Sequence, residues 1–179
     1  EQRGYLDTLQ RNSGVLLKLL NDILDVTRLE TGLVTLESIS FNLVELVEGL
    51  EALFQVLSKE KELYLTCHFP AHFQPQRQGD PARLRQVLAN LLDNAIKFTK
   101  TGGVTMAINQ APDDINKLTI SVSDTGIGIP ADRQRAVFDY FNQADNSMSR
   151  VYGGTGLGLS ICAPLVDMMR GRLWRERAQ

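Results

Sequence analysis

Two asparagines and a lysine lie on one side of a predicted helix over residues 81–99, in the segment PARLRQVLANLLDNAIKFT. At about 100° per residue, Asn90, Asn94 and Lys97 project together with Arg83, opposite an arc of leucines. A solvated face is the ordinary explanation of a polar stripe, although asparagine is a poor helix former. Amide oxygens can ligate Mg²⁺ and a lysine can meet phosphate charge, so the second explanation is a site for a metal-bound phosphate.

A carboxylate ends a predicted strand in the segment LTISVSDTGIGIP. Apolar residues alternate up to Val122, Asp124 follows, and Gly126 and Gly128 predict a turn. At the end of a sheet, a carboxylate can accept a hydrogen bond from an exocyclic amine such as that of adenine; the simpler interpretation is an aspartate that stabilises its own turn. The letters DTG also occur in aspartic proteases, which need two aspartates sharing a proton, so a homodimer would have to supply the second.

The segment YGGTGLGLS, residues 152–160, has four glycines in nine positions. It is not the phosphate loop of NTPases, which needs a lysine followed by serine or threonine. It is not the dinucleotide fingerprint either, which would need glycine where Leu159 or Ile161 stands. What remains is a glycine loop that runs directly into a predicted apolar helix over about residues 157–169. Free backbone N–H groups and the positive end of such a helix favour an anion.

A heptad pattern predicts a first helix over residues 6–29, which Gly32 ends. Apolar and small residues recur there at alternating steps of three and four, and two more leucines widen the stripe. Such a stripe has to be covered, either by the chain's own domain or by a second copy in a dimeric bundle, and the unbroken heptads favour the dimer. The stripe consists of Leu6, Leu9, Ser13, Leu16, Leu17, Leu20, Ile23, Leu24 and Thr27.

Helices and strands are mixed in the rest of the chain, and neighbouring strands read as antiparallel. This order predicts an α+β fold, a two-layer sandwich of a mixed sheet covered by helices on one face. Asn42 and Asp80 are predicted to cap two of the helices, the second with Pro81 in its first turn, and Pro164 predicts a kink in the last helix. The predicted strands are 33–38, 62–69, 102–110, 117–124 and 171–177; the predicted helices are 41–61, 81–99, 131–137 and 157–169.

The composition is that of a globular domain with a real core. Of 179 residues, 43% are hydrophobic and 22% are charged, and the formal net charge of −2 gives no general attraction to nucleic acid. No apolar run reaches the roughly 18 residues that span a bilayer, and the N-terminus does not read as a signal peptide. The two cysteines, Cys67 and Cys162, are far apart, so no disulfide framework is indicated and a cytoplasmic location is expected.

Taken together and in this order, four segments resemble the ATP-binding domain of sensor histidine kinases in the GHKL superfamily. NLLDNAIKFT is similar to its N box, DTGIGI to its first glycine box, FDYF to its phenylalanine box and GGTGLGLSI to its second glycine box. The first helix, ending LLNDILDVTRLETG, resembles the second helix of the dimerisation hairpin, most closely in hybrid sensor kinases. The resemblance implies a partial dimerisation hairpin over residues 1–31 and a GHKL-type catalytic domain over residues 32–179.

The resemblance also implies roles for single residues. Asn94 would ligate Mg²⁺, Asn90 would support the metal and the phosphates, Lys97 would meet phosphate, and Asp124 would read the adenine amine. Residues 142–153 would form a lid over the nucleotide. The remaining implied positions are Gly126 and Gly128 beside base and sugar; Phe138 and Phe141 at the base of the lid; Arg150 on the terminal phosphate; and Gly154, Thr155, Gly156, Leu157 and Gly158 at the lid hinge.

The implied activity is transfer of the γ-phosphate of ATP to a histidine, followed by relay to a response-regulator receiver domain. Gyrase and chaperone relatives carry a water-orienting glutamate where this chain has Asn90, which cannot act as a base and so favours transfer over hydrolysis. The family's acceptor histidine lies on the first helix of the hairpin. The only histidines here, His68 and His72, lie elsewhere, so the chain is not expected to phosphorylate itself in the usual way, and Cys67 beside them lacks the further ligands of a metal site.

Two departures from the family pattern leave a second hypothesis open. Arg170 replaces a glycine of the family's MMGG, and the segment after it stops short of a further glycine-rich turn and a closing strand. The chain would then be a degenerate nucleotide-binding domain that regulates another kinase through its first helix. In either case the expected partners are a second copy and a receiver domain, without nucleic acid, and with membrane contact only through other parts of a longer protein.

Overall fold

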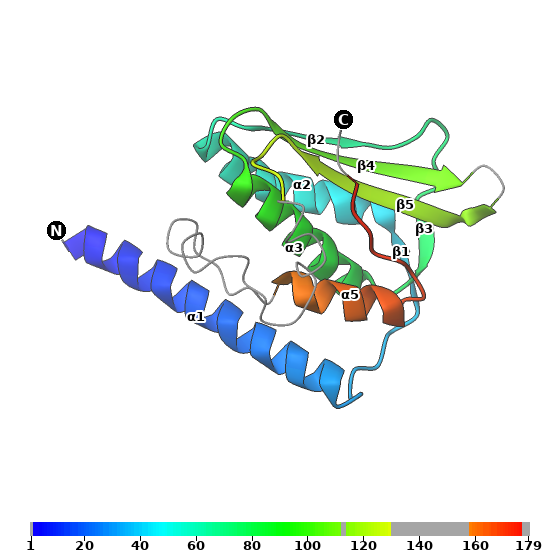
Figure 1. Ribbon diagram of the computed structural model, residues 1–179, viewed down its shortest axis with the longest axis horizontal. Helices are drawn as coiled ribbons and strands as arrows, with labels where there is room; N and C mark the ends of the chain where they lie inside the picture. Colours follow the sequence, from blue (N-terminus) through cyan, green and yellow to red (C-terminus); the bar gives the residue numbers. More distant parts are fainter. Residues whose placement is uncertain (1, 112–113, 130–157, 177–179) are drawn as a thin grey trace.

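The computed structural model describes residues 2–111, 114–129 and 158–176 of the chain. A long helix comes first, and a mixed set of strands and shorter helices follows it (Figure 1). The elements are α1 (Gln2–Glu30), β1 (Ile39–Asn42), α2 (Leu43–Glu60), β2 (Tyr64–His68), β3 (Gln76–Gly79), α3 (Pro81–Phe98), β4 (Gly103–Ala111), β5 (Asp114–Asp124) and α5 (Gly158–Met168).

The main sheet has the order β2-β4-β5, with β2 parallel to β4 and β4 antiparallel to β5. A separate two-stranded ribbon pairs β1 with β3 in antiparallel register. Helices α2 and α3 lie against one face of the main sheet, α5 packs beside α3, and α1 contacts α5 on the side away from the sheet (Figure 1). The predicted sandwich of a mixed sheet with helices on one face, preceded by a long helix, is confirmed.

The core lies between this sheet and helices α2 and α3. Apolar residues recur at helical spacing on both helices and at every second position on β4, so each element turns one apolar side to the same layer. Burial of these side chains is the main stabilising term of the domain. The fully buried members include Val47, Leu50, Leu88, Leu92, Val104, Met106 and Ile108.

The two predicted helix caps are confirmed. The side-chain oxygen of Asn42 accepts from the backbone N–H groups of Val44 and Glu45, at 3.0 and 3.3 Å. Asp80 accepts from the N–H of Arg83 at 2.9 Å, and Pro81 occupies the first turn, where its missing N–H costs nothing. These caps fix where α2 and α3 begin, and α3 carries the asparagine stripe.

Two predicted strands are wrong. Residues 33–38 have no strand, and β1 starts only at Ile39, where β3 supplies an antiparallel partner for its backbone groups. The described part of the predicted last strand, residues 171–176, is not a strand either, because Leu173 packs onto the cluster between α3 and α5 instead. The sequence also gave no indication of β3, whose residues QRQG lack the branched and aromatic side chains typical of strands.

Helix α5 begins at Gly158 and runs through Pro164 to Met168. Proline removes one backbone donor from the helix, while Ile161, Cys162 and Leu165 remain buried against α3 and hold the element in place. The kink expected at Pro164 stays a prediction. The predicted short helix at 131–137 lies outside the described residues.

Helix α1 is confirmed, and Gly32 follows it with a left-handed φ of +66°. The predicted apolar stripe is exposed: Leu16, Leu20 and Ile23 are 65%, 55% and 53% exposed. A different side of α1 faces the domain, with Asp22 and Val26 buried, and Val26 belongs to the cluster between α3 and α5. Within the described ranges, no helix is both long and apolar enough to cross a membrane.

Candidate functional site

The polar side of α3 has an open acceptor at Asn94. The Nδ2 of Asn94 donates to the backbone carbonyl of Asn90, one turn earlier, at 2.8 Å. This bond fixes the amide so that Oδ1 points the other way, and among the described residues Oδ1 has no hydrogen-bond partner. A half-buried amide oxygen held in one orientation by its own helix is a suitable ligand for a hard cation such as Mg²⁺.

Asn90 joins α3 to the first turn of α5. Its side chain is only 9% exposed, and Nδ2 donates to the backbone carbonyl of Gly158 at 3.2 Å. A Cβ on Gly158 would lie 3.2 Å from Oδ1 of Asn90, so glycine allows this close approach. The N box and the end of the glycine-rich segment, 68 residues apart in sequence, therefore meet at this hydrogen bond.

The thiol of Cys162 also forms a hydrogen bond at Gly158. Its Sγ donates to the carbonyl of Gly158 at 3.1 Å, the same acceptor that Asn90 uses. Burial raises the pKa of Cys162 to about 12, although the hydrogen bond from Asn90 acts in the opposite direction. The thiol is therefore neutral at physiological pH and acts as a packing group, not as a nucleophile.

The turn after β5 is folded against the carboxyl end of α3. Asp124 is exposed, and its Oδ1 accepts from the N–H of Gly126 at 2.8 Å. A Cβ at Gly126 would lie 2.6 Å from the carbonyl oxygen of Phe98, and the N–H of Ile127 donates to that same oxygen at 3.4 Å. Gly128 has a φ of +67°, which favours glycine. Asp124 and the last turn of α3 are therefore held side by side.

Lys61, the residue that caps the end of α2, forms hydrogen bonds with the last turn of α3. Its Nζ donates to the carbonyls of Ile96 and Lys97, at 2.9 and 3.1 Å, which places a cation on carbonyls at the negative end of the helix. The Nζ of Lys97 lies 4.9 Å from the centre of the Phe98 ring. The sequence patterns identified Lys97 but not Lys61, which belongs to no motif and is 35 and 36 residues from its two partners.

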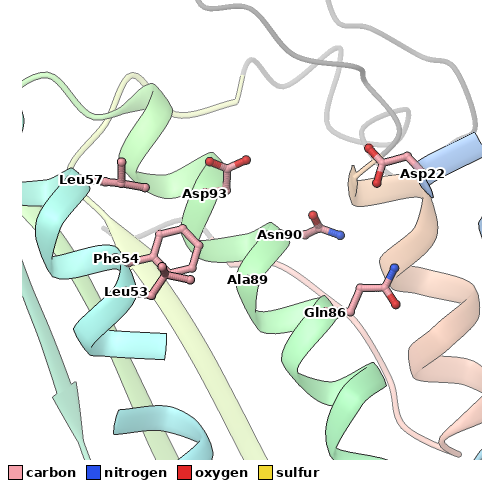
Figure 2. A pocket seen from close by; sticks show the side chains of 8 residues that line it. All are labelled: Asp22, Leu53, Phe54, Leu57, Gln86, Ala89, Asn90 and Asp93. Carbon is pink, nitrogen blue, oxygen red and sulfur yellow. The ribbon is translucent and has the colours of Figure 1, made fainter. Parts of the chain in front are cut away.

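A pocket opens beside Asn90 where three helices meet (Figure 2). Its volume is about 390 Å³. One side consists of apolar side chains of α2, and Asp22 of α1 lies on the opposite side (Figure 2). The lining residues are Asp22, Leu53, Phe54, Leu57, Gln86, Ala89, Asn90 and Asp93.

Arg83 does not join the asparagines, although the helical wheel placed it on their side. Its Nη1 lies 3.2 Å from Oδ1 of Asp25 on α1 and donates to Gln86 at 2.8 Å, and Gln86 in turn donates to Asp25 at 2.6 Å. These three side chains attach α1 to α3 about two turns before Asn90. Arg83 therefore belongs to the contact with the first helix.

Cys67 and His68 lie on opposite faces of β2, as strand geometry requires. Cys67 is turned toward α2, where burial in the first place, and then the charge of Glu51, raise the pKa of its thiol to about 12. His68 is exposed, and His72 lies in the following loop with a φ of +62°. These three residues do not face one another as a metal site requires.

The structure thus brings several predicted site residues to one region. Asn90, Asn94 and Lys97 lie along α3, Gly158 is bonded to Asn90, and the turn of Asp124, Gly126 and Gly128 packs on the end of α3. The rest of the predicted site lies outside the described residues: Phe138, Phe141, Arg150, Gly154, Thr155, Gly156, Leu157 and the lid, 142–153.

The sequence model of the histidine kinase-, DNA gyrase B- and HSP90-like ATPase family matches residues 79–179, which include α3, the Asp124 turn and α5. The chain belongs to this family. Its ATP-binding domain is of the histidine kinase type, as the relatives below show.

Among curated proteins, the chain is similar to two bacterial sensor kinases. It is 42% identical over 172 residues to the signal transduction histidine-protein kinase BarA of Escherichia coli strain K12, with 95% of this chain covered. It is 40% identical over 174 residues to the sensor protein GacS of Pseudomonas syringae pv. syringae, with 96% covered. In both comparisons the chain spans only 19% of the relative's length.

Solved structures agree. Full-length ShkA in complex with AMPPNP has a TM-score of 0.80 at 31% identity, covering 94% of this chain and 34% of that one. The histidine kinase ThkA, in complex with the response regulator protein TrrA, has a TM-score of 0.67 at 24% identity, covering 93% of this chain and 44% of that one. The second likeness supports the fold alone.

Proposed function

We propose that this chain binds ATP with Mg²⁺ along α3 and forms the catalytic part of a sensor histidine kinase. The observation that carries the proposal is the Oδ1 of Asn94, which has no hydrogen-bond partner among the described residues and is oriented by the bond from Nδ2 to the carbonyl of Asn90. Asn94 would ligate Mg²⁺, and Asn90 would support the site one turn earlier. Bound Mg²⁺ would offset the charge of the triphosphate.

The other residues of the site fit the same ligand. Lys97 would contact phosphate. Asp124 would accept a hydrogen bond from the adenine amine through Oδ2, since Oδ1 already accepts one from the backbone N–H of Gly126. Gly126 and Gly128 would let the base and sugar approach the turn. Arg150 and the hinge Gly154, Thr155, Gly156, Leu157 and Gly158 are proposed to close over the phosphates; of these, the structure describes Gly158, bonded to Asn90.

The proposed reaction is phosphoryl transfer to a histidine outside this chain. The bond between the γ-phosphorus and its bridging oxygen breaks, a bond to an imidazole nitrogen forms, and ADP leaves. The position one turn before Asn94 is Asn90, whose amide cannot deprotonate water and whose Nδ2 is already bonded to Gly158. This favours a protein acceptor over hydrolysis, and a response-regulator receiver domain would take the phosphoryl group next.

The first helix is proposed to make the chain a homodimer. Leu16, Leu20 and Ile23 lie on one stripe of α1 and are more than half exposed, which a second copy of the helix would cover. We accordingly retain the division into a partial dimerisation hairpin, residues 1–31, and a catalytic domain, residues 32–179. A cytoplasmic location is part of the same proposal.

Calorimetric titration with AMPPNP, with and without Mg²⁺, tests the proposal. The unmodified chain is expected to bind, and Asn94→Ala should lose at least about tenfold in affinity, only when Mg²⁺ is present. Asn21→Ala, which removes an exposed asparagine from α1, is the matched control and should bind normally. No binding by the unmodified chain would contradict the proposal and favour the regulatory module.

That alternative is supported by the exposed stripe of α1 and by the missing strand at 171–176.

A further inference from the structure

Thr125 holds the turn that carries Asp124, through a hydroxyl that is engaged on two sides. The Oγ1 of Thr125 accepts from the backbone N–H of Gly103 at 3.0 Å and donates to the carbonyl of Thr101 at 2.8 Å. The backbone N–H of Thr125 donates to the carbonyl of Gly103 at 3.1 Å. A hydroxyl has a single proton, so these two bonds use it as one donor and one acceptor.

The hydroxyl of Thr125 adds to the β4–β5 pairing just past its last registered pair, where the backbone N–H of Thr125 also donates to the carbonyl of Gly103. That pair is Val104 with Asp124, and the side chain of Thr125 continues the pairing to the turn at residues 101–103. The backbone is therefore fixed on both sides of the Asp124 carboxylate: by the ladder before it and by Thr125 after it.

Two glycines make this contact close. Gly102 has a φ of +90°, and a Cβ there would collide with Oγ1 of Thr125. A Cβ on Gly103 would collide with the carbonyl oxygen and the ring of Tyr64. The N–H of Tyr64 donates to the carbonyl of Gly102 at 3.1 Å. The turn is thus packed between β2 and Thr125 and gives the hydroxyl a rigid support.

Fixing the backbone also fixes the carboxylate. Oδ1 of Asp124 accepts from the N–H of Gly126 at 2.8 Å, and within the described part of the chain Oδ2 has no hydrogen-bond partner. Gly126 itself is confined, since the carbonyl oxygen of Phe98 lies 2.6 Å from where its Cβ would be. The direction of Oδ2 therefore depends on where Thr125 places the turn.

We propose that Thr125 is a positioning residue for base selection, acting through Asp124; this inference rests on the proposed nucleotide site. At the position where adenine has an amine, guanine has a carbonyl oxygen, from which a carboxylate can accept nothing. A mobile carboxylate could shift to the ring N–H beside that carbonyl and to the amine on the next carbon, and so tolerate guanine. A carboxylate held by Thr125 cannot make this shift. The two hydrogen bonds of the Thr125 hydroxyl, to Gly103 and Thr101, are called the Thr125 clasp below, and the clasp therefore favours adenine.

The substitutions that test this separate the hydroxyl from the shape of the side chain. Thr125→Val keeps the shape and loses both hydrogen bonds, and Thr125→Ser keeps the hydroxyl. Thr101→Val is the control, because Thr101 contributes only its backbone carbonyl to the clasp. We expect Thr125→Val to weaken AMPPNP binding about fivefold and to lower the preference for AMPPNP over GMPPNP by a similar factor. Thr125→Ser and Thr101→Val should stay within about twofold of the unmodified chain.

Calorimetry with both nucleotides and Mg²⁺ on the full chain decides the matter, well below the unfolding temperature of every variant. The preference between two bases is a ratio, so loss of folded protein does not move it. An unchanged ratio in Thr125→Val overturns the inference, and so does a Thr125→Ser variant that is as unselective as Thr125→Val. Absence of AMPPNP binding by the unmodified chain overturns the proposed function as well.

A measurement on the unmodified chain covers the case in which Thr125→Val fails to fold. The Gly103 amide, which donates to Thr125, should exchange with solvent at least about tenfold more slowly than the amide of exposed Gly128. Equal exchange at the two glycines would show that the clasp does not hold in solution and would overturn the inference.

Discussion

Helices α1 and α3 are both amphipathic, yet they use their two sides in opposite ways. Helix α3 buries its apolar side in the core, with Leu88 and Leu92 1% and 0% exposed, and presents asparagines on the other. Helix α1 leaves its apolar stripe exposed and contacts the domain through Asp22, Asp25 and Val26. The difference shows that a hydrophobic stripe indicates which side needs cover but not which molecule supplies it. For α3 the cover is the sheet; for α1 we propose a second copy.

The largest expected effect is on the free energy of unfolding, when one leucine of each apolar stripe is replaced by alanine. Leu92→Ala in α3 should lower the free energy of unfolding by about 3 kcal/mol, since it leaves a cavity in a packed core. Leu20→Ala in α1 should change it by less than about 0.5 kcal/mol in dilute, monomeric protein. Urea denaturation measures both, and equal losses would show that the α1 stripe is packed within its own chain.

The second prediction concerns association through α1. Replacing Leu20 and Ile23 together by glutamate puts like charges on the proposed contact and should weaken self-association at least about tenfold. Sedimentation equilibrium over a range of concentrations measures it. Val56→Glu, on α2 and outside the pocket between the helices, is the control and should leave association unchanged. A double variant that associates like the unmodified chain would remove α1 from the dimer contact.

The third prediction tests how α1 is attached to α3. Asp25→Asn removes the charge that faces Arg83, and the partly buried pair should contribute about 1 kcal/mol. Hydrogen exchange of the amides near Asp25 should become about fivefold faster, while the core amides of α3 keep their rates. Glu30→Gln, at the exposed end of the helix, is the matched control. Unchanged exchange in Asp25→Asn would mean that Val26 and its apolar neighbours alone hold the helix.

The smallest expected effect concerns α5, the helix that contacts both α1 and α3. Arg170 follows α5 with a φ of +59°, and the N–H of Gly171 returns to the carbonyl of Val166 at 2.9 Å, a helix end that favours glycine at position 170. Arg170→Gly should therefore raise the free energy of unfolding by about 0.5 kcal/mol. Arg172→Gly, outside this motif, should not stabilise. Thermal unfolding compares them, and a loss in Arg170→Gly would show that the arginine side chain stabilises this end.

Much of the fold was predictable because its signals are local. The caps at Asn42 and Asp80, the alternation along β4 and β5, and the helical periodicity of α2 and α3 depend on residues within one or two turns. The strands β1 and β3 were not predictable, because Gln76–Gly79 becomes a strand only through pairing with Ile39–Asn42, more than thirty residues away. The strand predicted over residues 171–177 was also wrong in its described part, because Leu173 packs on a cluster formed by distant helices.

The candidate site divides in the same way. Spacing identified Asn90, Asn94 and Lys97, and the order of the motifs related them to Asp124. The supports of these residues are long-range contacts: Lys61 on the end of α3 and the hydroxyl of Thr125 on residues 101–103. The contact that turns Arg83 away from the site, to Asp25 of α1, is long-range as well. Ordinary lysines, threonines and arginines carry no spacing signal, so only the folded chain reveals them.

One measurement tests the central claim, that α3 holds a nucleotide while α1 serves association. Amide exchange of the full chain is compared with and without AMPPNP and Mg²⁺. We predict slower exchange in the amides of residues 94–98 and 124–128 and no change in those of residues 13–24. Unchanged exchange around Asn94 and Asp124 at saturating nucleotide, or protection confined to α1, would contradict the account.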